Sequence, residues 1–449
     1  MKTEMKKTLF MVAAVALAAA VSCNKEGLGD NGEGQAPSSI VFTAGVETKT
    51  TLVDNGDKTY SINWNNGDAI TVDGVTFTTL SEGAKADFST ESAFSEDNDY
   101  EAIYPATAGT SFASVTVPAS QVAVAGNFCS SAAVSVAKST TTSLDFKNVT
   151  SFLKFQVPAN ATKVTISSSG PLAGEVSVDY NNGEPTWTAK NTVNTLTVTC
   201  DGGFKTGVDY YVSVLPGEKT NFEVRLDGYL SKNATSVTAK RSIVMNMKTL
   251  PAPVQNGYLQ GSFNSWSGGQ PLYDDLNGWT VLKNFTISAD NTEVKFEKNG
   301  TWTGYDGSFY LNCYANATSG KGGNIKINKG TYDFYYHSES SAIYVTEAGA
   351  LAPGVKRPVR LLVNNYANAT NLRVYMWNNS DQPIIGDWNN RPYMTNKVTL
   401  NGTTYTYYEL GEEYFGQTLN YKLTWDGNES QDVTGVYFGC DAYYDLWSK

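Results

Sequence analysis

Tight-turn dipeptides recur along this chain and separate short runs of alternating apolar residues. From residue 40 onward, almost no stretch places apolar residues at the i, i+3, i+4, i+7 spacing of an amphipathic helix. The runs are instead rich in β-branched and aromatic residues, as β-strands are. They cover residues 152–157, 164–166, 196–200, 210–215, 294–296, 332–336, 372–376, 405–408 and 419–423.

The turn dipeptides are Asn-Gly and Asp-Gly, which supply the positive φ angles that two-residue hairpin turns need. After the N-terminal segment, Asn-Gly begins at residues 55, 66, 182, 256, 277, 299 and 401, and Asp-Gly begins at residues 73, 201, 227, 306 and 426. Short strands with such turns predict an all-β chain, made of several β-sandwich domains in series.

The charge of the chain and its single histidine exclude several classes of function. Against 33 Lys and Arg there are 44 Asp and Glu, and the net charge of −11 repels a phosphate backbone. We therefore expect no nucleic-acid partner. His337 is the only histidine, which excludes histidine-based catalytic triads and paired-histidine zinc sites. We expect neither a metal nor another cofactor.

Catalysis of glycoside hydrolysis would need two carboxylates at a defined separation in a cleft. The adjacent pairs Asp274–Asp275 and Glu412–Glu413 are poor candidates, because neighbouring residues on a strand face opposite ways. A parallel (β/α) catalytic domain would also need helices, whose pattern the sequence lacks. We therefore predict that the chain is not an enzyme.

The first 22 residues have the pattern of a secretory signal. Three lysines precede an apolar run over residues 9–21, which as a helix would span only about 20 Å of a membrane core about 30 Å thick. Small residues then lead to Cys23, and this resembles a bacterial lipoprotein signal. The resemblance implies cleavage before Cys23 and lipidation of its thiol; an ordinary secreted protein with an incidental cysteine is the alternative. Residues 23–37 are Gly-rich and acidic, which predicts a flexible tether.

Four further cysteines lack the C-x-x-C spacing of a metal or redox motif. A disulfide between Cys129 and Cys200 is open at this point, since an oxidising compartment would permit it. We expect Cys313 and Cys440 to be free, packed thiols.

Proline-containing linkers divide the rest of the chain. One covers residues 250–253, and the second covers residues 349–358; a residue before proline is held in extended geometry. The predicted domains are a first β-sandwich over residues 38–157, a second over residues 158–250, and two modules over residues 257–348 and 359–449.

Strand motifs in the N-terminal half resemble a known family. They are "VFTAGVETKTT" (41–51), "INWNNGDAITVD" (62–73), "LDFKNVTSFLKFQV" (144–157) and "VTAKRSIVMNMKTL" (237–250). They look like the fimbrillin-like surface lipoproteins of the Bacteroidetes, and this resemblance implies two transthyretin-like sandwiches. From the strand pattern itself, we expect Trp64, Phe146, Phe152 and Phe155 to lie in the core.

Motifs in the C-terminal half resemble glycan-binding modules. "GYLQGSFNSW" (257–266), "NGWTVLKNFTI" (277–287), "VKFEKNGTW" (294–302) and "GGNIKINKGTYDFYY" (322–336) look like modules of the starch-binding outer-membrane lipoproteins of Bacteroidetes polysaccharide-utilisation systems. "LRVYMWNN" (372–379), "IIGDWNNRPYM" (384–394), "YTYYEL" (405–410) and "LNYKLTWDGNESQDV" (419–433) resemble a starch-binding carbohydrate-binding module. The resemblance implies immunoglobulin-like sandwiches and an α-glucan partner held by an aromatic pair and a glutamine near the final turn.

Aromatic residues beside turns are candidate sugar contacts in both modules. A flat ring covers the C–H face of a sugar at little cost in rotamer entropy, while a few polar groups meet the hydroxyls. In residues 257–348 the candidates are Trp266, Trp302 and Tyr305, with Lys298 as a hydrogen-bond donor. Trp279 begins a strand pattern and is expected in the core.

In the last module Tyr375 and Trp377 share a strand face at period 2, and Met376 between them points into the core. Trp388 with Asn389 is a further candidate, and Trp425 is a lesser one. Gln431 is added by its position in the resemblance. For each aromatic residue the alternative is packing in a core or at its rim.

The main hypothesis is a lipid-anchored protein of the outer membrane and cell surface. It would bind polysaccharide without catalysis, through two modules, and retain the glycan at the membrane; the resemblance also allows an outer-membrane transporter complex as a partner. The alternative is a fimbrial accessory or tip adhesin subunit, which differs in assembling by strand exchange.

Overall fold

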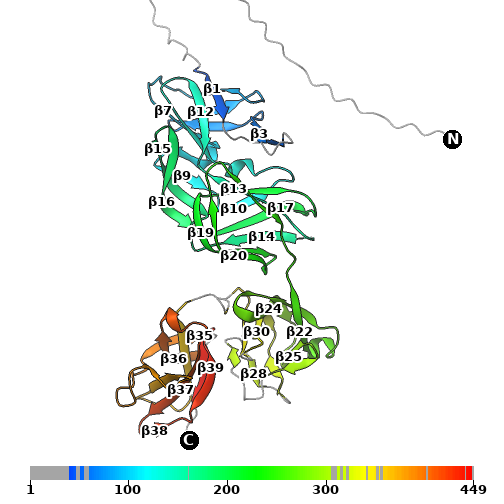
Figure 1. Cartoon of the computed structure of the whole chain (residues 1–449), viewed down its shortest axis with the longest axis vertical. Coiled ribbons are helices and arrows are strands. Elements are labelled where there is room, and N and C mark those ends of the chain that lie inside the picture. Colours follow the sequence, from blue (N-terminus) through cyan, green and yellow to red (C-terminus); the bar gives the residue numbers. More distant parts are fainter. Residues whose placement is uncertain are drawn as a thin grey trace, which may run out of the picture. The chain divides into compact units, whose positions relative to one another are not determined.

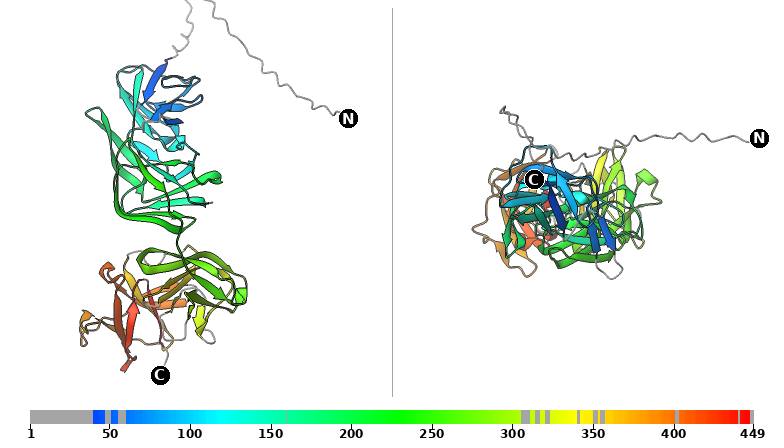
Figure 2. Two further views of the ribbon diagram at one scale, coloured as in Figure 1. Left: turned by 45° about the vertical axis from the view of Figure 1, so that its right-hand side comes forward. Right: turned by 90° about the horizontal axis from the view of Figure 1, so that it is seen from above.

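A computed structural model describes residues 40–46, 51–54, 60–159, 161–304, 311–313, 317–319, 323–339, 342–349, 353, 357–400, 403–439 and 441–446. In these residues the regular structure is β-strand with only single-turn 3₁₀ segments between strands (Figures 1 and 2). The prediction of an all-β chain with several sheets is confirmed. Each of the apolar runs named above overlaps a strand.

The first sheet closes on itself as a barrel, in the order β1-β12-β11-β7-β4-β5-β6. Strand β1 closes it by pairing parallel to β12 and antiparallel to β6. Trp64 is 1% exposed in the barrel core, donates from Nε1 to the Ala44 carbonyl at 2.9 Å, and lies edge-to-face with Phe146. Both residues are therefore core, as predicted.

The barrel strands are β1 Phe42–Val46, β4 Ala69–Val72, β5 Val75–Thr79, β6 Ala86–Ser89, β7 Tyr100–Tyr104, β11 Ser135–Ser139 and β12 Ser143–Asn148. A separate hairpin is formed by β2 Thr51–Asp54 and β3 Tyr60–Asn63.

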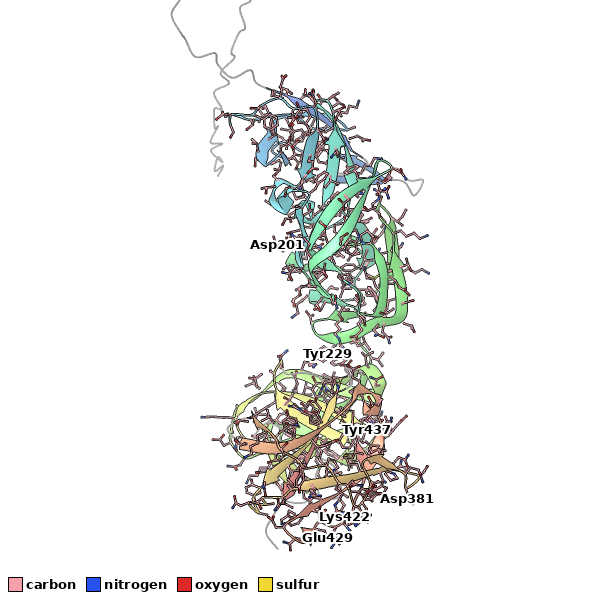
Figure 3. The ribbon with its side chains drawn as sticks, turned by 90° about the vertical axis from the view of Figure 1, so that its left-hand side faces the viewer. Asp201, Tyr229, Asp381, Lys422, Glu429 and Tyr437 are labelled. Carbon is pink, nitrogen blue, oxygen red and sulfur yellow. The ribbon has the colours of Figure 1, made fainter. Side chains whose placement is uncertain are left out.

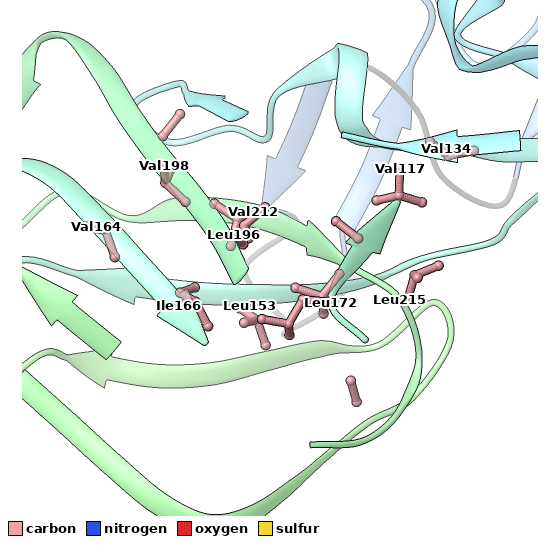
Figure 4. Close-up of a cluster of buried hydrophobic side chains, with 14 of the residues drawn as sticks. Val117, Val134, Leu153, Val164, Ile166, Leu172, Leu196, Val198, Val212 and Leu215 are labelled. Carbon is pink, nitrogen blue, oxygen red and sulfur yellow. The ribbon is translucent and has the colours of Figure 1, made fainter. Parts of the chain in front are cut away.

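Three sheets surround the second core, in the orders β10-β17-β14-β19-β20, β18-β13-β21 and β16-β15-β9-β8. Figure 4 shows its packing, with Val117, Leu153 and Val198 among the buried side chains. Strands β8 to β10 lie in sequence between barrel strands, yet β9 pairs with β15 and β10 pairs with β17. The two domains are thus interleaved along the chain. Phe152 and Phe155 are buried, as predicted.

The strands of these sheets are β8 Gly109–Ser111, β9 Ser114–Val117, β10 Ser120–Ala123, β13 Ser151–Gln156, β14 Ala161–Ser167, β15 Ala173–Asn181, β16 Glu184–Val193, β17 Thr195–Phe204, β18 Tyr210–Val214, β19 Gly217–Leu226, β20 Tyr229–Ala239 and β21 Val244–Thr249, with 3₁₀ turns η1 Ala106–Ala108 and η2 Ser130–Ala132.

The described strands between residues 255 and 347 form one continuous sheet in the order β27-β31-β30-β24-β23-β22-β25-β29-β28, with β26 added to β25. Its core contains Leu259, Phe296 and Phe334. The elements are β22 Gln255–Gly261, η3 Ser262–Asn264, β23 Gln270–Asp274, η4 Leu276–Gly278, β24 Trp279–Ile287, β25 Thr292–Lys298, β26 Thr301–Thr303, β27 Leu311–Cys313, β28 Ala317–Ser319, β29 Ile325–Ile327, β30 Gly330–His337 and β31 Ala342–Glu347.

The last module is a sandwich of two sheets. One has the order β35-β36-β32-β40, and the other has the order β34-β33-β37-β38 with β39 also on β37. Their inner faces meet in one core that includes Val363, Met376 and Tyr421. The elements are β32 Val359–Asn365, β33 Arg373–Asn378, β34 Pro383–Ile385, β35 Asn396–Leu400, β36 Thr403–Leu410, η6 Glu412–Tyr414, β37 Thr418–Trp425, β38 Asn428–Glu429, β39 Val433–Tyr437 and β40 Ala442–Leu446.

Most of the turn dipeptides in the described residues do form turns with a positive φ at the Asn or Asp, for example 47° at Asp73. The Asn256-Gly257 dipeptide does not, because it lies inside β22, where the pairing with β23 shifts register. Gly257 has φ +113°, and a Cβ there would stand 2.7 Å from the Glu297 carbonyl oxygen. This glycine permits the close approach of β25 and not a hairpin turn.

Candidate functional site

Strand β33 presents its predicted aromatic residues on the outer face of its sheet. Val374 and Met376 are fully buried in the sandwich core, so Tyr375 and Trp377 point the other way. Their rings are stacked, with centroids 5.4 Å apart and planes at 27°. The period-2 prediction for Tyr375, Met376 and Trp377 therefore holds in the structure.

The loop after β34 brings Trp388 to this pair. Its ring meets Tyr375 edge-to-face at a centroid distance of 5.4 Å. Asp387 holds the loop by accepting from the backbone N–H groups of Asn389 and Asn390 at 2.8 and 2.9 Å, and from the Asn390 amide at 2.9 Å. These hydrogen bonds, the one from the Asn390 side chain first, hold the pKa of Asp387 below its usual value.

We call Tyr375, Trp377 and Trp388 the aromatic face. Trp388 is 41% exposed, and Tyr375 and Trp377 are each half-buried. Three rings at fixed angles on one sheet surface offer apolar contact area with defined orientation, which suits a flat ligand with C–H faces.

Basic residues surround the aromatic face. The Arg391 guanidinium lies 4.1 Å from the Trp388 ring centroid, and its Nε donates to the Thr424 hydroxyl at 3.2 Å. A second Arg391 nitrogen donates to the Trp388 carbonyl. Lys422 is the cross-strand neighbour of Tyr375 and forms ion pairs with Asp432 at 3.0 Å and Glu429 at 3.4 Å. Figure 3 labels Lys422 and Glu429 in the last module. The hydrogen bond to Asp432 is the main cause of the raised pKa of Lys422.

The remaining predicted residues of the last module contribute no ring or guanidinium to these contacts. Asn389 is exposed and contributes its backbone N–H to the Asp387 turn. Gln431 is exposed between β38 and β39, and its carbonyl accepts from the Ser430 hydroxyl. Trp425 is 8% exposed and belongs to the core, so its selection as a lesser candidate was wrong. Trp425 points to the same side of β37 as the buried Leu423.

A second aromatic pair lies in the preceding module. The rings of Trp266 and Trp302 have centroids 6.1 Å apart and planes at 55°. Trp302 is 45% exposed, while Trp266 is half-buried and has φ +62°, which is unusual for a bulky residue. Its backbone N–H donates to the Gly261 carbonyl at 2.9 Å.

The register of β25 and β26 places Lys298 away from this pair. Trp302 pairs with Glu297, and Lys298 pairs with Thr301. Because residues alternate between the two faces of a strand, Lys298 is on the side of buried Phe296, opposite to Trp302. Trp279 is 1% exposed and is core, as predicted. Tyr305 and Cys23 lie outside the described residues.

Sequence reasoning missed several residues beside these surfaces. Arg373 is on the same face as Tyr375 and could have been found by extending the period-2 pattern one step back. Arg391 follows Trp388 by three residues, but only the folded loop shows that it covers the ring. Tyr258 is 38% exposed and pairs with Glu297 beside Trp302; no sequence signal distinguishes it from the other tyrosines.

The adjacent carboxylates weighed for catalysis have structural partners. Asp275 accepts from Arg225 at 2.7 and 3.0 Å and from the Leu276 N–H at 2.8 Å, and Asp274 accepts from the Asn256 amide at 2.6 Å. Glu412 and Glu413 are exposed in η6. Cys129 and Cys200 are free thiols, so they do not form a disulfide with each other. The side chain of Cys313 and the whole of Cys440 lie outside the residues that the structure describes.

The described residues hold no group of three or more His, Cys, Asp or Glu side chains placed to bind a metal ion. A cavity of about 900 Å³ is lined by polar residues such as Ser168, Arg225 and Asp333, and by none of the predicted site residues. Within the part of the chain that the structure describes, no helix has the length and apolar character needed to cross a bilayer.

No protein-family model and no curated protein matches the chain. Among solved structures it is similar to a candidate cell adhesion protein from Bacteroides ovatus, at 14% identity over 48% of this chain and 93% of that one, with a TM-score of 0.31. A fimbrial protein from the same organism matches at 10% identity, over 48% of this chain and 52% of that one, with a TM-score of 0.22. A pullulanase from Bacillus acidopullulyticus matches at 12% identity, over 40% of this chain and 28% of that one, with a TM-score of 0.15.

Proposed function

We propose that this chain is a non-catalytic glycan-binding protein of the cell surface and that the aromatic face is its main binding site. The observation that carries the proposal is the group of Tyr375, Trp377 and Trp388, in which an exposed Trp388 adjoins two half-buried rings and the three are positioned by a sheet and a hydrogen-bonded loop. A sugar ring has an apolar C–H face and a rim of hydroxyls. Aromatic rings cover the first, and the nearby Lys422 and Thr424 provide polar groups for the second.

The Trp266–Trp302 pair is a second binding surface under this proposal. Each hydrogen bond to a sugar hydroxyl nets only about 0.5–1.5 kcal/mol, because water must be displaced, so a single surface binds weakly. Two surfaces on one chain raise the overall affinity when one polysaccharide engages both, because the second contact becomes intramolecular.

The cellular setting is part of the proposal and rests on the sequence. Lipidation at Cys23 would anchor the chain to the outer membrane, where the protein would retain polysaccharide for an outer-membrane transporter complex. Starch and related α-glucans are the first glycans to test, because the motifs of both C-terminal modules resemble starch-binding modules.

Affinity electrophoresis of the full chain tests the main proposal. Gels would contain amylopectin, pullulan or unrelated neutral and charged glycans. We expect retardation in at least one glycan gel, and its loss in Trp377→Ala and Trp388→Ala. Tyr366→Ala is the matched control, because Tyr366 is 48% exposed and follows β32 in the other sheet of the same module. Unretarded migration in every gel would refute glycan binding, and retardation confined to glycans without α-glucosyl residues would refute the α-glucan assignment.

A fimbrial accessory or tip adhesin subunit is the second candidate function. It is favoured by the fimbrillin-like motifs, which the fold uses as structural strands: residues 42–46 close the barrel as β1, and residues 244–249 pair parallel to β13 as β21. Purified fimbriae that contain this chain would favour the subunit, whereas its recovery only with the membrane fraction would favour the anchored glycan-binding protein.

A further inference from the structure

Two arginines beside the aromatic face have no carboxylate partner among the described residues. The chain has six arginines, and Arg225, Arg241 and Arg360 each form an ion pair with an Asp or Glu. Arg373 and Arg391 instead contact aromatic rings and neutral oxygen atoms. An unpaired guanidinium is noteworthy in a chain with a net charge of −11, because acidic partners are abundant.

The two arginines meet at one place on the sheet. Arg373 is the cross-strand neighbour of Thr424, and Arg391 donates from Nε to the Thr424 hydroxyl at 3.2 Å. The Arg373 guanidinium lies 3.8 Å from the ring centroid of Tyr393, which is 50% exposed. We call Arg373 and Arg391 the arginine pair; it adjoins Tyr375 and Trp388 of the aromatic face.

Stacking on a ring fixes the plane of a guanidinium and leaves hydrogen-bond donors at its edge. Arg373 uses one of these donors for the Tyr393 hydroxyl, and Arg391 uses two, for Thr424 and the Trp388 carbonyl. The remaining N–H groups of each form a planar array that matches the oxygen atoms of a carboxylate or a sulfate.

The acidic residues of this surface already have partners. Glu429 and Asp432 are paired with Lys422, and Asp387 accepts three hydrogen bonds from its own loop. Lys422 is therefore neutralised, and the arginine pair is the uncompensated positive charge next to the aromatic face.

We propose that the last module binds an anionic saccharide, with a sugar ring against the aromatic face and its carboxylate or sulfate held by Arg373 and Arg391. This inference rests on the proposed function and changes its substrate class, since the resemblance of the sequence implies a neutral α-glucan. A chain of this net charge repels polyanions in general, so a local arginine pair is what an acidic glycan would require.

The test compares glycans that share a backbone and differ in charge. Binding of the full chain to pullulan, carboxymethyl pullulan and pullulan sulfate would be measured by isothermal titration at fixed ionic strength, with polygalacturonate and chondroitin sulfate as anionic glycans of other backbones. We expect at least one anionic glycan to bind about tenfold or more tightly than pullulan. The carboxylated and sulfated forms show which anion the pair prefers.

Charge-matched variants locate the effect. Arg373→Gln and Arg391→Gln should each remove most of the preference for the anionic glycan, while Lys397→Gln, which removes the same charge from an exposed position on β35, should keep it. Arg391 also supports Trp388, so Arg391→Lys, which keeps the charge, and a thermal unfolding curve show whether that loop has remained in place.

The outcomes separate this inference from the proposed function. Equal or tighter binding of pullulan, with loss of binding only in Trp377→Ala, would overturn the anionic class and leave glycan binding standing. A preference for anions that survives the loss of both arginines would also overturn the inference. No binding to any of these glycans would overturn both.

Discussion

Lys219 on β19 is a buried cation without a carboxylate partner among the described residues, and replacing it with Met should stabilise the second domain. Its side chain is 1% exposed, and its ammonium donates to the Pro216 carbonyl at 3.2 Å. Burial lowers the pKa of Lys219 from 10.5 to about 8. A methionine has a similar length and a flexible apolar side chain that can fill the same space.

The size and the sign of the effect follow from that pKa. Each tenfold change in proton affinity is worth about 1.4 kcal/mol, so burial of the charged lysine costs at most about 3.5 kcal/mol. The unfolded chain holds this proton up to pH 10.5, whereas the folded chain releases it near pH 8. Between these values the unfolded state binds more protons, so the free energy of unfolding rises with pH. Below pH 8 Lys219 is charged in the folded state as well, so the full cost of burying its charge reduces the free energy of unfolding.

Allowing about 1 kcal/mol for the lost hydrogen bond, we expect Lys219→Met to gain about 1–2 kcal/mol at pH 7. Differential scanning calorimetry of the full chain should then show one transition raised by about 2–8 °C. The gain should vanish as the pH rises toward 10.5. Lys163→Met, at an exposed position on β14 of the same sheet, should change little. A lower transition temperature for Lys219→Met at pH 7, or a gain that does not depend on pH, would refute the reasoning.

Two further predictions concern buried rings. The pKa of His337 lies below 6.5 because burial disfavours its charged form; the 2.9 Å hydrogen bond between its Nε2 and the Asn277 carbonyl oxygen acts the other way and is outweighed. Stability should therefore fall as the pH drops from 6.5 toward the folded-state pKa, because the unfolded chain takes up the proton first. NMR titration of this single imidazole checks the sign, and a midpoint above 6.5 would contradict it. Trp64→Phe should destabilise the barrel by about 1–3 kcal/mol, because it removes the hydrogen bond to Ala44 and part of a packed ring. Hydrogen exchange in peptides from β4 to β7 measures this, and unchanged protection in those peptides would show that the barrel does not depend on the indole.

Local patterns predicted nine apolar runs that each overlap a strand, but they did not predict which strands pair. The run at 152–157 has the alternation of a half-buried strand, and it became β13. Nothing in residues 109–123 indicates that β9 and β10 pair with β15 and β17, because those partners lie more than 50 residues further along the chain. The Asn256-Gly257 dipeptide was misread for the same reason. Its role depends on β25, which approaches it from a distant part of the sequence.

The same limit applies to the candidate site. The alternation of side chains along β33 predicted that Tyr375 and Trp377 share a face. The same alternation along β37 places Trp425 on the side of Leu423, in the core. Trp425 was nevertheless named as a candidate because the adjacent Asp-Gly turn was given more weight. The position of Trp388 over Tyr375 could not be predicted. It depends on a loop whose path is set by hydrogen bonds to Asp387 and by the contact of Arg391 with the ring.

Trp388 and Trp266, one from each aromatic surface, are positioned by different contacts, and such contacts affect the entropy cost of binding a weak ligand. Ordering a mobile side chain on binding costs about 0.5–1.5 kcal/mol, which is comparable with the net gain from one hydrogen bond. Trp388 is contacted by the Arg391 guanidinium and lies on a loop that the Asp387 turn holds, whereas the Trp266 ring packs against Trp302 and its backbone has φ +62°. A backbone in that region costs of order 1–3 kcal/mol, and this cost falls on folding. Under the proposed function, ring contacts that form on folding reduce the ordering cost that a sugar face would otherwise have to offset.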